Sequence, residues 1–551
     1  MQRFLICLLF FTGISMGISR AQSPVQVHFS QPFYVSGEVV WYKLYLPENF
    51  PSGPKVVTVS LLDAKDRLVE QSYLRRSSGS VLTGFYQIPF DWKSGVYRLI
   101  FSATKADGHE PLILAETRLP IYDDLEEELG NVEGPNPQVA GKGEGFPLQV
   151  NIEMSQDVYE PGKQVDIRIR VSNEQGRPVA GDVSAVVRDQ SLFAVEQAGF
   201  SAIQTGEVLR DTTDWEEDIN IRGQLLNPED RSPLPGGNIA AYLSRTYGFL
   251  YAKADDKGQF TLDLPGLYGD IPMHMMGFVP EDILVELDQK PATSPLKQVA
   301  LPYPNAVKQY LALSRKRKLI YQLYGLLEQS INTIPANIKF SKPEADSPIP
   351  LDEYEAFPDL ATMVRDLSIP VRFREWEKDR LGVRIFDPSQ TLRSYYTDRP
   401  IFIVDGMLTR DDHYIANLDI TKVEHFDLFY AFERLLKLYG PIARYGAIRI
   451  ESRNRNIAVP EQDQKNRFDL KGFPAEVSYP VMAQSFEKVP VQLRPVLYWQ
   501  PEAQTNAEGI LEFTIPLTDD QSRFEVEVLV QDKAGRRGQG QVYFSVKAGE
   551  K

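Results

Sequence analysis

Cysteine is almost absent from this chain: Cys7 is the only one among 551 residues. It lies in the apolar run 4–11, inside a segment that resembles a removable export signal. Once that segment is cleaved, the chain has no disulfide, no cysteine nucleophile and no thiolate metal site. We therefore expect its domains to be held together by their hydrophobic cores alone.

The first 21 residues have the three features of a secretory signal peptide. Arg3 supplies a positive start, residues 4–11 form an apolar core, and Ser19 and Ala21 are small residues at a cleavage site. The apolar run is shorter than the roughly 20 residues that a membrane span needs, and no later segment is long enough. We expect cleavage after Ala21 and an exported protein, in the periplasm or associated with the outer membrane.

Histidine is also scarce, and the common catalytic motifs are missing. Among five histidines, His413 and His425 are near each other in sequence but have no third ligand nearby, which favours structural roles. The sequence contains no His-Glu-x-x-His, no Gly-x-Ser-x-Gly, no phosphate loop and no dinucleotide fingerprint. We therefore expect a protein that is not an enzyme, with no catalytic residue, no cofactor and no metal.

Positive charge is in deficit, with 60 basic against 75 acidic residues and a net charge of −15. A surface of this sign argues against nucleic acid as a partner, because basic patches supply most of that affinity. The hydrophobic content of 42% is ample for folded cores. A chain of this length predicts several domains.

Residues 22–120 predict an all-β sandwich. Short segments rich in β-branched and aromatic residues alternate with turn signals, as in 39–46, 56–62 and 95–101. The phrase Phe33–Tyr42, with Gly37 at a turn, resembles the start of a macroglobulin domain. That resemblance implies a scaffold and no active site.

Two further β regions resemble macroglobulin domains. In residues 147–214 the segment Val158–Val165 repeats the aromatic, turn and strand pattern of the first sandwich, and 166–171 alternates as a half-buried strand. In residues 456–551 the segment Phe524–Val530 also alternates. We expect two separate sandwiches here, the second macroglobulin-like domain and a C-terminal one.

Two connecting segments carry runs of charge. Residues 121–146 form an acidic linker rich in Gly and Pro, in which Asp123–Gly130 is expected to be solvated, and a calcium site is the weaker alternative. Residues 304–330 predict a helical connector capped by Asn305. Its basic run Arg315–Lys318 is expected to be a solvated face, with an acidic partner or lipid headgroups as alternatives.

Residues 215–300 resemble the small carboxypeptidase-regulatory-like β-sandwich. They contain a glycine-bearing strand at 219–226, a Pro-Leu-Pro-Gly turn and an Asp-x-x-Gly-x-Phe turn. Asp255 and Asp256 are metal-ligand candidates, but a hairpin turn in which Gly258 has positive φ is the favoured interpretation.

Residues 350–455 resemble the α+β plug domain of TonB-dependent outer-membrane receptors. The match rests on the segments Arg399–Met407 and Leu438–Ile450, with strands expected at 382–386, 401–404, 423–429 and 447–450 and a helix at 432–439. Arg444 and Tyr445 stand where the family usually has Ser or Asn. The partner-binding residues implied by the resemblance are Arg399, Asp405, Gly406, Tyr439, Gly440 and Gly446.

The order of these regions resembles exported proteins of the Bacteroidetes type, and together they predict a mainly β, multi-domain chain. The residues after the plug-like part are too few for a large transmembrane barrel. The leading hypothesis is therefore an interaction protein that docks on, and can plug, an outer-membrane barrel or secretion complex formed by another chain. The alternatives are a peptide- or glycan-binding adhesion module and a noncovalent macroglobulin-like protease inhibitor whose bait lies in 121–146.

Overall fold

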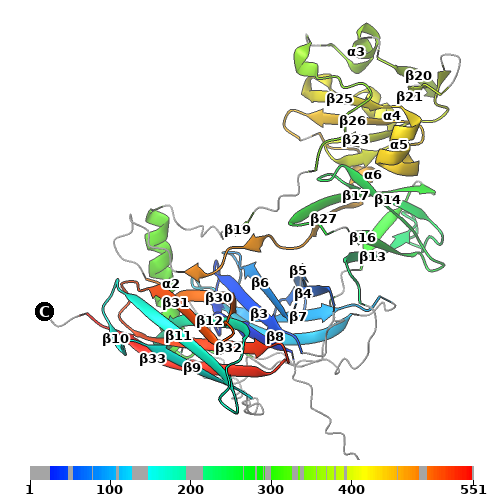
Figure 1. Cartoon of the computed structure of the whole chain (residues 1–551). Helices are drawn as coiled ribbons and strands as arrows, with labels where there is room; N and C mark the ends of the chain where they lie inside the picture. The colour runs from blue at the N-terminus through cyan, green and yellow to red at the C-terminus, as the bar shows by residue number, and fades with distance from the viewer. Residues whose placement is uncertain are drawn as a thin grey trace, which may run out of the picture.

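The computed structural model describes residues 25–47, 54–76, 79–106, 111–126, 147–193, 215–264, 266–279, 282–288, 291, 300–324, 333–334, 340–354, 357–367, 369–377, 380–389, 394–455, 457–482 and 493–548. The expected signal peptide therefore lies outside the described residues. The chain is mainly β and multi-domain, as the sequence predicts. Figure 1 shows a lower body of packed sheets and an upper arm, with connectors running between them.

The first sandwich contains residues 25–122. Its two sheets follow the orders β1-β3-β6 and β2-β8-β7-β4-β5. Their strands are β1 (Gln26–Phe29), β2 (Tyr34–Val35), β3 (Val39–Tyr45), β4 (Val56–Leu62), β5 (Leu68–Arg75), β6 (Val81–Gln87), β7 (Gly95–Ala103) and β8 (Leu112–Tyr122). All seven residues of β3 are buried, because Tyr42 and Leu44 enter the core while Trp41 packs against the second sandwich.

The second sandwich is built from two distant parts of the chain, residues 147–189 and 481–546. Its sheets follow the orders β10-β33-β32-β12-β30-β29 and β31-β11-β9. The strands are β9 (Leu148–Met154), β10 (Val158–Tyr159), β11 (Gln164–Asn173), β12 (Gly181–Asp189), β29 (Val481–Met482), β30 (Val496–Gln504), β31 (Ile510–Pro516), β32 (Arg523–Asp532) and β33 (Arg537–Val546).

This pairing corrects the expectation of two separate sandwiches at 147–214 and 456–551. Strand β12 lies between β30 and β32, and β11 pairs with β31 over its length. Either half alone would leave strand edges unpaired and one shared core exposed. Local patterns identify each strand but contain no information about a partner more than 300 residues away.

The two sandwiches pack face to face in the lower body (Figure 1). Trp41 and Val39 of the first contact Val186 and Trp499 of the second in one apolar cluster. Buried hydrogen bonds add to the contact: His28 Nδ1 lies 2.5 Å from Ser184 Oγ, to which the Tyr45 hydroxyl is also bonded. Most of the buried polar groups at this interface are hydrogen-bonded, while His28 Nε2 and Trp499 Nε1 have no hydrogen-bond partner among the described residues.

Helix α2 (Asn305–Leu323) docks on the first sandwich near the short helix α1 (Gln190–Phe193). The N-cap residue of α2 is Pro304 and not the predicted Asn305, and no side chain caps the helix by a hydrogen bond. The expectation that the basic run Arg315–Lys318 is solvated is wrong for two of its residues. Arg317 is buried against Glu38, and Lys318 pairs with Asp124.

The acidic linker is likewise corrected where it is described. Asp124 is fully buried and accepts hydrogen bonds from Ser314 and Lys318, while Asp123 pairs with Lys93. Neither carboxylate is solvated, and Asp124 holds α2 against the sandwich. The rest of the predicted linker, residues 127–146, lies outside the described residues.

The lower part of the arm is a small sandwich formed mainly by residues 219–287. Its sheets follow the orders β16-β13-β18 and β15-β14-β17-β27. The strands are β13 (Ile219–Leu226), β14 (Asn238–Leu243), β15 (Gly248–Lys253), β16 (Gln259–Leu264), β17 (Asp270–Val279), β18 (Leu284–Leu287) and β27 (Arg467–Lys471). The predicted turn is present: the Asp255 carboxylate accepts from Lys257 N and Gln259 N, and Gly258 has φ of +74°.

The upper part of the arm is an α+β unit over residues 340–464. Its main sheet follows the order β24-β23-β26-β25, and a ribbon follows β20-β21-β22. The strands are β20 (Val371–Glu377), β21 (Arg380–Asp387), β22 (Ser394–Tyr395), β23 (Ile401–Val404), β24 (Met407–Thr409), β25 (Val423–Phe429) and β26 (Ala447–Ser452). The helices are α3 (Leu360–Asp366), α4 (Asp412–Ala416), α5 (Phe432–Tyr439) and α6 (Glu461–Gln464), with 3₁₀ turns η1 (Leu351–Glu353), η2 (Ile420–Lys422) and η3 (Gly440–Ala443).

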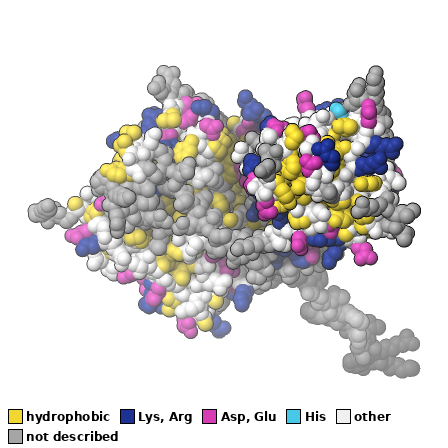
Figure 2. All heavy atoms as spheres, turned by 90° about the horizontal axis from the view of Figure 1, so that it is seen from above, with side chains coloured by type: hydrophobic (Ala, Val, Ile, Leu, Met, Phe, Trp, Pro, Cys, Tyr) yellow, Lys and Arg dark blue, Asp and Glu magenta, His cyan; other side chains and the backbone are white. Residues whose placement is uncertain are grey.

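The elements expected in this unit lie where the sequence places them, and Gly440 ends α5 with φ of +66°. The chain then returns to the lower body through β27 and a connector in which β28 (Glu476–Val477) pairs with β19 (Thr333–Ile334). Figure 2, seen from above, shows acidic and basic side chains interspersed on the visible surface, with apolar groups among them.

Candidate functional site

The plug-like motif residues lie together, but they face the small sandwich of the arm. Tyr439 is buried between Phe249 and Phe429, and its carbonyl accepts the Tyr251 hydroxyl. A Cβ on Gly440 would meet the Tyr251 ring at 2.7 Å, and one on Gly406 would lie 2.8 Å from Ser244 Cβ. These residues therefore form a contact between the two units of the arm.

The other three predicted residues also have local structural contacts. Asp405 accepts hydrogen bonds from the Ser452 amide and hydroxyl and from Ile457 N, so it fixes the loop after β23. Gly446 has φ of +97° and approaches Ile385. Arg399 is half-buried at the start of β23.

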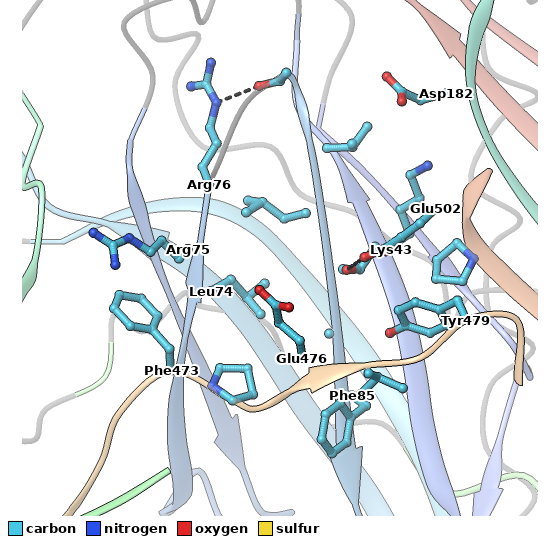
Figure 3. Close-up of a pocket in the computed structure, with 18 of the residues that line it drawn as sticks. Lys43, Leu74, Arg75, Arg76, Phe85, Asp182, Phe473, Glu476, Tyr479 and Glu502 are labelled. Atoms are coloured by element: carbon cyan, nitrogen blue, oxygen red, sulfur yellow. Dashed lines mark hydrogen bonds between the residues drawn. The ribbon is translucent and has the colours of Figure 1, made fainter. Parts of the chain in front are cut away.

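A different feature has the geometry of a binding site: a cleft of about 900 Å³ where the two sandwiches meet the base of the arm. We call it the junction cleft. Its walls come from β5 and β6 of the first sandwich, from β30 of the second, and from the connector around β28. Figure 3 shows Arg75 and Phe473 on one side, Lys43 and Tyr479 on the other, and Glu476 between them.

One wall of the junction cleft is the edge strand β6, which contributes residues 81–85. Among the described strands, β6 pairs only with β3. Leu46 N donates to Ser80 O and Ile88 N donates to Glu38 O, so the even-numbered residues of β6 are bonded to β3. The backbone N–H and C=O of Val81, Thr83 and Phe85 therefore point away from β3, toward the open edge.

Aromatic side chains line the same part of the cleft. Phe85 lies 5.3 Å from Trp41, and Trp41 lies 6.1 Å from Tyr479, measured between ring centroids. The Thr83 hydroxyl donates to Glu502 Oε1 over 2.6 Å. An apolar shelf with a few polar groups is the usual lining of a ligand site.

The far end of the cleft is basic and adjoins the arm. The Arg75 guanidinium stacks on Phe473 at 5.4 Å and lies 3.8 Å from the Asp218 carboxylate. Arg76 Nε donates to Gly79 O over 2.6 Å, the contact drawn in Figure 3. The Arg75 contacts link the base of the arm to β5, whereas the Arg76 bond lies within the first sandwich.

Lys43 is the buried charged group of this site, with 1% of its surface exposed. Its ammonium donates to Val183 O over 3.2 Å and lies 4.8 Å from the centre of the Tyr45 ring. Burial lowers the pKa of Lys43 to about 7, although Asp182 and Glu502 act in the opposite direction. In the sequence, a lysine within the otherwise apolar strand 39–45 is the feature that could have indicated a buried charged group here.

The histidines form no metal site in the described part of the chain, where no group of three or more His, Cys, Asp or Glu side chains has suitable geometry. His413 Nδ1 accepts from Leu381 N, and His425 lies 4.0 Å from Glu424. No described helix is long and apolar enough to cross a membrane.

The fold defines a mainly β protein with several domains, and comparisons with known proteins add the following. No protein-family model and no curated protein matches the chain. The matching solved structures include native alpha-2-macroglobulin of Escherichia coli, with a TM-score of 0.24, 8% identity and coverage of 95% of this chain and 40% of that one.

Two further matches are of the same kind. The elastase-activated Escherichia coli protein gives a TM-score of 0.25 and 9% identity, covering 96% of this chain and 44% of that one. A Salmonella alpha-2-macroglobulin variant gives 0.24 and 8%, covering 96% and 40%. This chain spans less than half the length of these proteins.

Proposed function

We propose that this chain is an exported, non-enzymatic interaction protein that binds an extended polypeptide segment in the junction cleft. The observation that carries the proposal is the open edge of β6, which forms one wall of a cleft of about 900 Å³. Export is inferred from the signal-like residues 1–21.

An open strand edge binds an extended peptide by adding it to the sheet as a further strand. In this cleft, the free backbone groups of Val81, Thr83 and Phe85 would supply hydrogen bonds without regard to sequence. Every second side chain of the bound segment would then lie on the face that holds Phe85 and Tyr479, where shape gives selectivity. This mode belongs to the peptide-binding alternative stated above.

Docking on an outer-membrane barrel through the plug-like motif finds no comparable support. Tyr439, Gly440 and Gly406 lie against the small sandwich, so that sandwich would have to separate before they could meet a barrel. The inhibitor alternative places its bait in residues 121–146, most of which lie outside the described residues.

The test is selection of a displayed random heptapeptide library on the chain from residue 22 and on two variants at Thr83. Thr83→Pro removes the outward amide, and proline is tolerated where an edge N–H faces the open side. Thr83→Val keeps that amide and removes only the hydroxyl that bonds Glu502. Because every bound peptide would use the same edge, we expect Thr83→Pro to weaken selected peptides at least tenfold, while Thr83→Val retains them.

Selected peptides that bind Thr83→Pro as well as the unchanged chain would contradict strand addition at β6. Failure to select any peptide would contradict the proposed function itself. A pull-down from outer membranes gives a further control. A stoichiometric barrel protein retained by Thr83→Pro would favour the docking hypothesis over peptide binding.

A further inference from the structure

We propose that Lys43 is a nucleophilic amine that captures an aldehyde or ketone group of a small ligand in the junction cleft as a Schiff base. The inference concerns the chemistry of one side chain. It stands whether or not a peptide binds along β6.

The surroundings of Lys43 Nζ are unusual for an ammonium group. An ammonium has three N–H donors, and its one hydrogen bond among the described residues goes to Val183 O. No described carboxylate forms an ion pair with it, although the side chain is almost fully buried. A buried charge without a counter-ion is costly, so the neutral amine is favoured over the ammonium.

The main chain next to Val183 is irregular. In the pairing of β12 with β30, Pro501 and Glu502 lie opposite the single residue Ser184, between the pairs Val183–Ala503 and Ala185–Gln500. Lys43, which is opposite Thr83 in the β3–β6 pair, donates to the Val183 carbonyl beside this bulge.

Charged groups on the neighbouring strands oppose the effect of burial on the pKa of Lys43. Asp182 on β12 and Glu502 on β30 favour the ammonium, and so does the Tyr45 ring. His28 on β1 is its cross-strand neighbour, but its ring is bonded to Ser184 and lies 3.8 Å from Glu527. Burial outweighs the two carboxylates and gives an amine with a pKa of about 7.

The reaction needs only the amine and a carbonyl compound. The lone pair of neutral Lys43 Nζ attacks the carbonyl carbon, and the oxygen takes up a proton to give a carbinolamine. Loss of water then forms the carbon–nitrogen double bond. No oxidant or reductant is consumed, and hydrolysis reverses the step.

The ligand class follows from the lining of the cleft. Lys43, Tyr479 and Phe85 lie on one wall, and Arg75 and Arg76 lie at the far end. An aromatic aldehyde fits the rings beside Lys43, and an anionic group on the same molecule would face the arginines. Pyridoxal 5′-phosphate has both features and is used below only as a probe.

The experiment treats the intact chain from residue 22 with pyridoxal 5′-phosphate and cyanoborohydride, which reduces the imine to a stable secondary amine. Modified lysines are located by peptide mass spectrometry over pH 6 to 9. We expect Lys43 to be modified at least tenfold faster at pH 7 than any exposed lysine, because an ordinary lysine with a pKa of about 10.4 is almost wholly protonated there.

The control is Lys533, which lines the same cleft but is exposed to solvent. The modification rate of Lys43 should level off above about pH 7, while that of Lys533 should still rise at pH 9. A Lys43→Arg variant should lose the fast modification and keep the slow ones. Modification of Lys43 no faster than that of Lys533 at pH 7, or a rate still rising at pH 9, would overturn the inference.

Discussion

At the scale of single residues, burial decides which side chains titrate in an unusual range. His274 on β17 is 2% exposed and joins the two units of the arm. Its Nδ1 accepts a hydrogen bond from Leu408 N over 2.9 Å, while Nε2 donates to Asp463 O. The bond from Leu408 requires an unprotonated Nδ1, and burial lowers the pKa of His274 to about 4 although the bond to Asp463 O acts in the opposite direction.

The first prediction concerns the pH dependence of arm stability. The folded pKa of His274 lies below the unfolded value of about 6.5, so the unfolded state binds a proton first as the pH falls. Stability is therefore lost between about pH 6.5 and 4, with a decrease of about 2 kcal/mol in unfolding free energy from pH 7 to pH 5. Urea unfolding of the unchanged chain at both pH values measures it.

A variant at the same position separates this contribution from that of the carboxylates. His274→Gln should be less stable at pH 7 and should lose about that much of the pH dependence. His425→Gln, at an exposed position, should keep the dependence of the unchanged chain. An identical pH slope in His274→Gln and in the unchanged chain would show that His274 does not titrate in this range.

Residue-level prediction from the sequence succeeds where the rule is local. The turn at Asp255 and Gly258 and the helix stop at Gly440 depend on neighbours within a few positions, and the structure contains them. Asp124 and Arg317 were expected to be solvated because the sequence shows which residues are charged but not which opposite charge lies beside each of them in the fold. Lys43 was missed for the same reason, since its cleft is made by three parts of the chain.

At the scale of elements, α2 is held by buried charge as well as by apolar packing. Arg317 donates to Glu38 Oε1 over 2.6 Å, and the Tyr310 hydroxyl donates to the same oxygen over 2.6 Å. Val307, Tyr310 and Leu311 pack on the first sandwich, whereas Leu319 and Leu323 are exposed. The helix turns its charged residues inward because the sandwich presents carboxylates there.

The second prediction is that Arg317→Met strongly destabilises the docking of α2. Removing the guanidinium leaves the Glu38 carboxylate buried without its cation, which typically costs about 3–5 kcal/mol. Hydrogen exchange of the α2 amides should accelerate, and the first unfolding transition should move to lower denaturant. Lys316→Met, on the exposed side of the helix, is the matched control.

A second variant tests whether the cost comes from the uncompensated carboxylate. Adding Glu38→Gln to Arg317→Met should restore a large part of the lost stability, because the buried charge is then removed. Equal stability of the single and the double variant would contradict a role for the ion pair and assign the effect to packing.

The third prediction concerns the contact between the two units of the arm. Gly440→Ala combines a positive φ with a Cβ that would lie 2.7 Å from the Tyr251 ring. Gly176→Ala has a similar φ, +73° against +66°, with nothing within 4 Å of the added Cβ. We expect Gly176→Ala to cost about 1 kcal/mol and Gly440→Ala clearly more, measured by urea unfolding.

The difference between these two glycine variants combines the close packing against Tyr251 with the ψ of −158° at Gly440, a conformation that is essentially restricted to glycine. Hydrogen exchange should also become faster at the ends of α5 and β15 in Gly440→Ala, and should stay unchanged there in Gly176→Ala. If both variants are destabilised equally, the motif glycine is required only for its backbone conformation, and the two arm units are less tightly packed than the structure indicates.

At the scale of the whole molecule, the arm and α2 are inserted into the second sandwich between β12 and β30. The two ends of the insertion lie side by side, since Asp189 N donates to Pro495 O over 2.7 Å. The junction cleft lies at the opposite end of β12 and β30, beside the paired residues Asp182 and Gln504, and the connector around β28 forms another of its walls. The sequence predicts the strands of this region, but it misplaces the domain boundaries because these strands pair with partners far away in the sequence.

The fourth prediction follows from this split: a chain ending at residue 482 should not fold its second sandwich. Strand β11 would lose its partner β31, and β12 would lose both β30 and β32. Strand β9 would keep its pairing with β11, but the core that it shares with residues 496–546 would be open to water. Hydrogen exchange should show these three strands unprotected, while β14 and β17 of the arm retain protection. A chain ending at residue 548 is the control and should behave as the full chain. Protected β11 and β12 in the shorter chain would mean that the region 147–214 folds without the C-terminal strands, as the sequence pattern predicts.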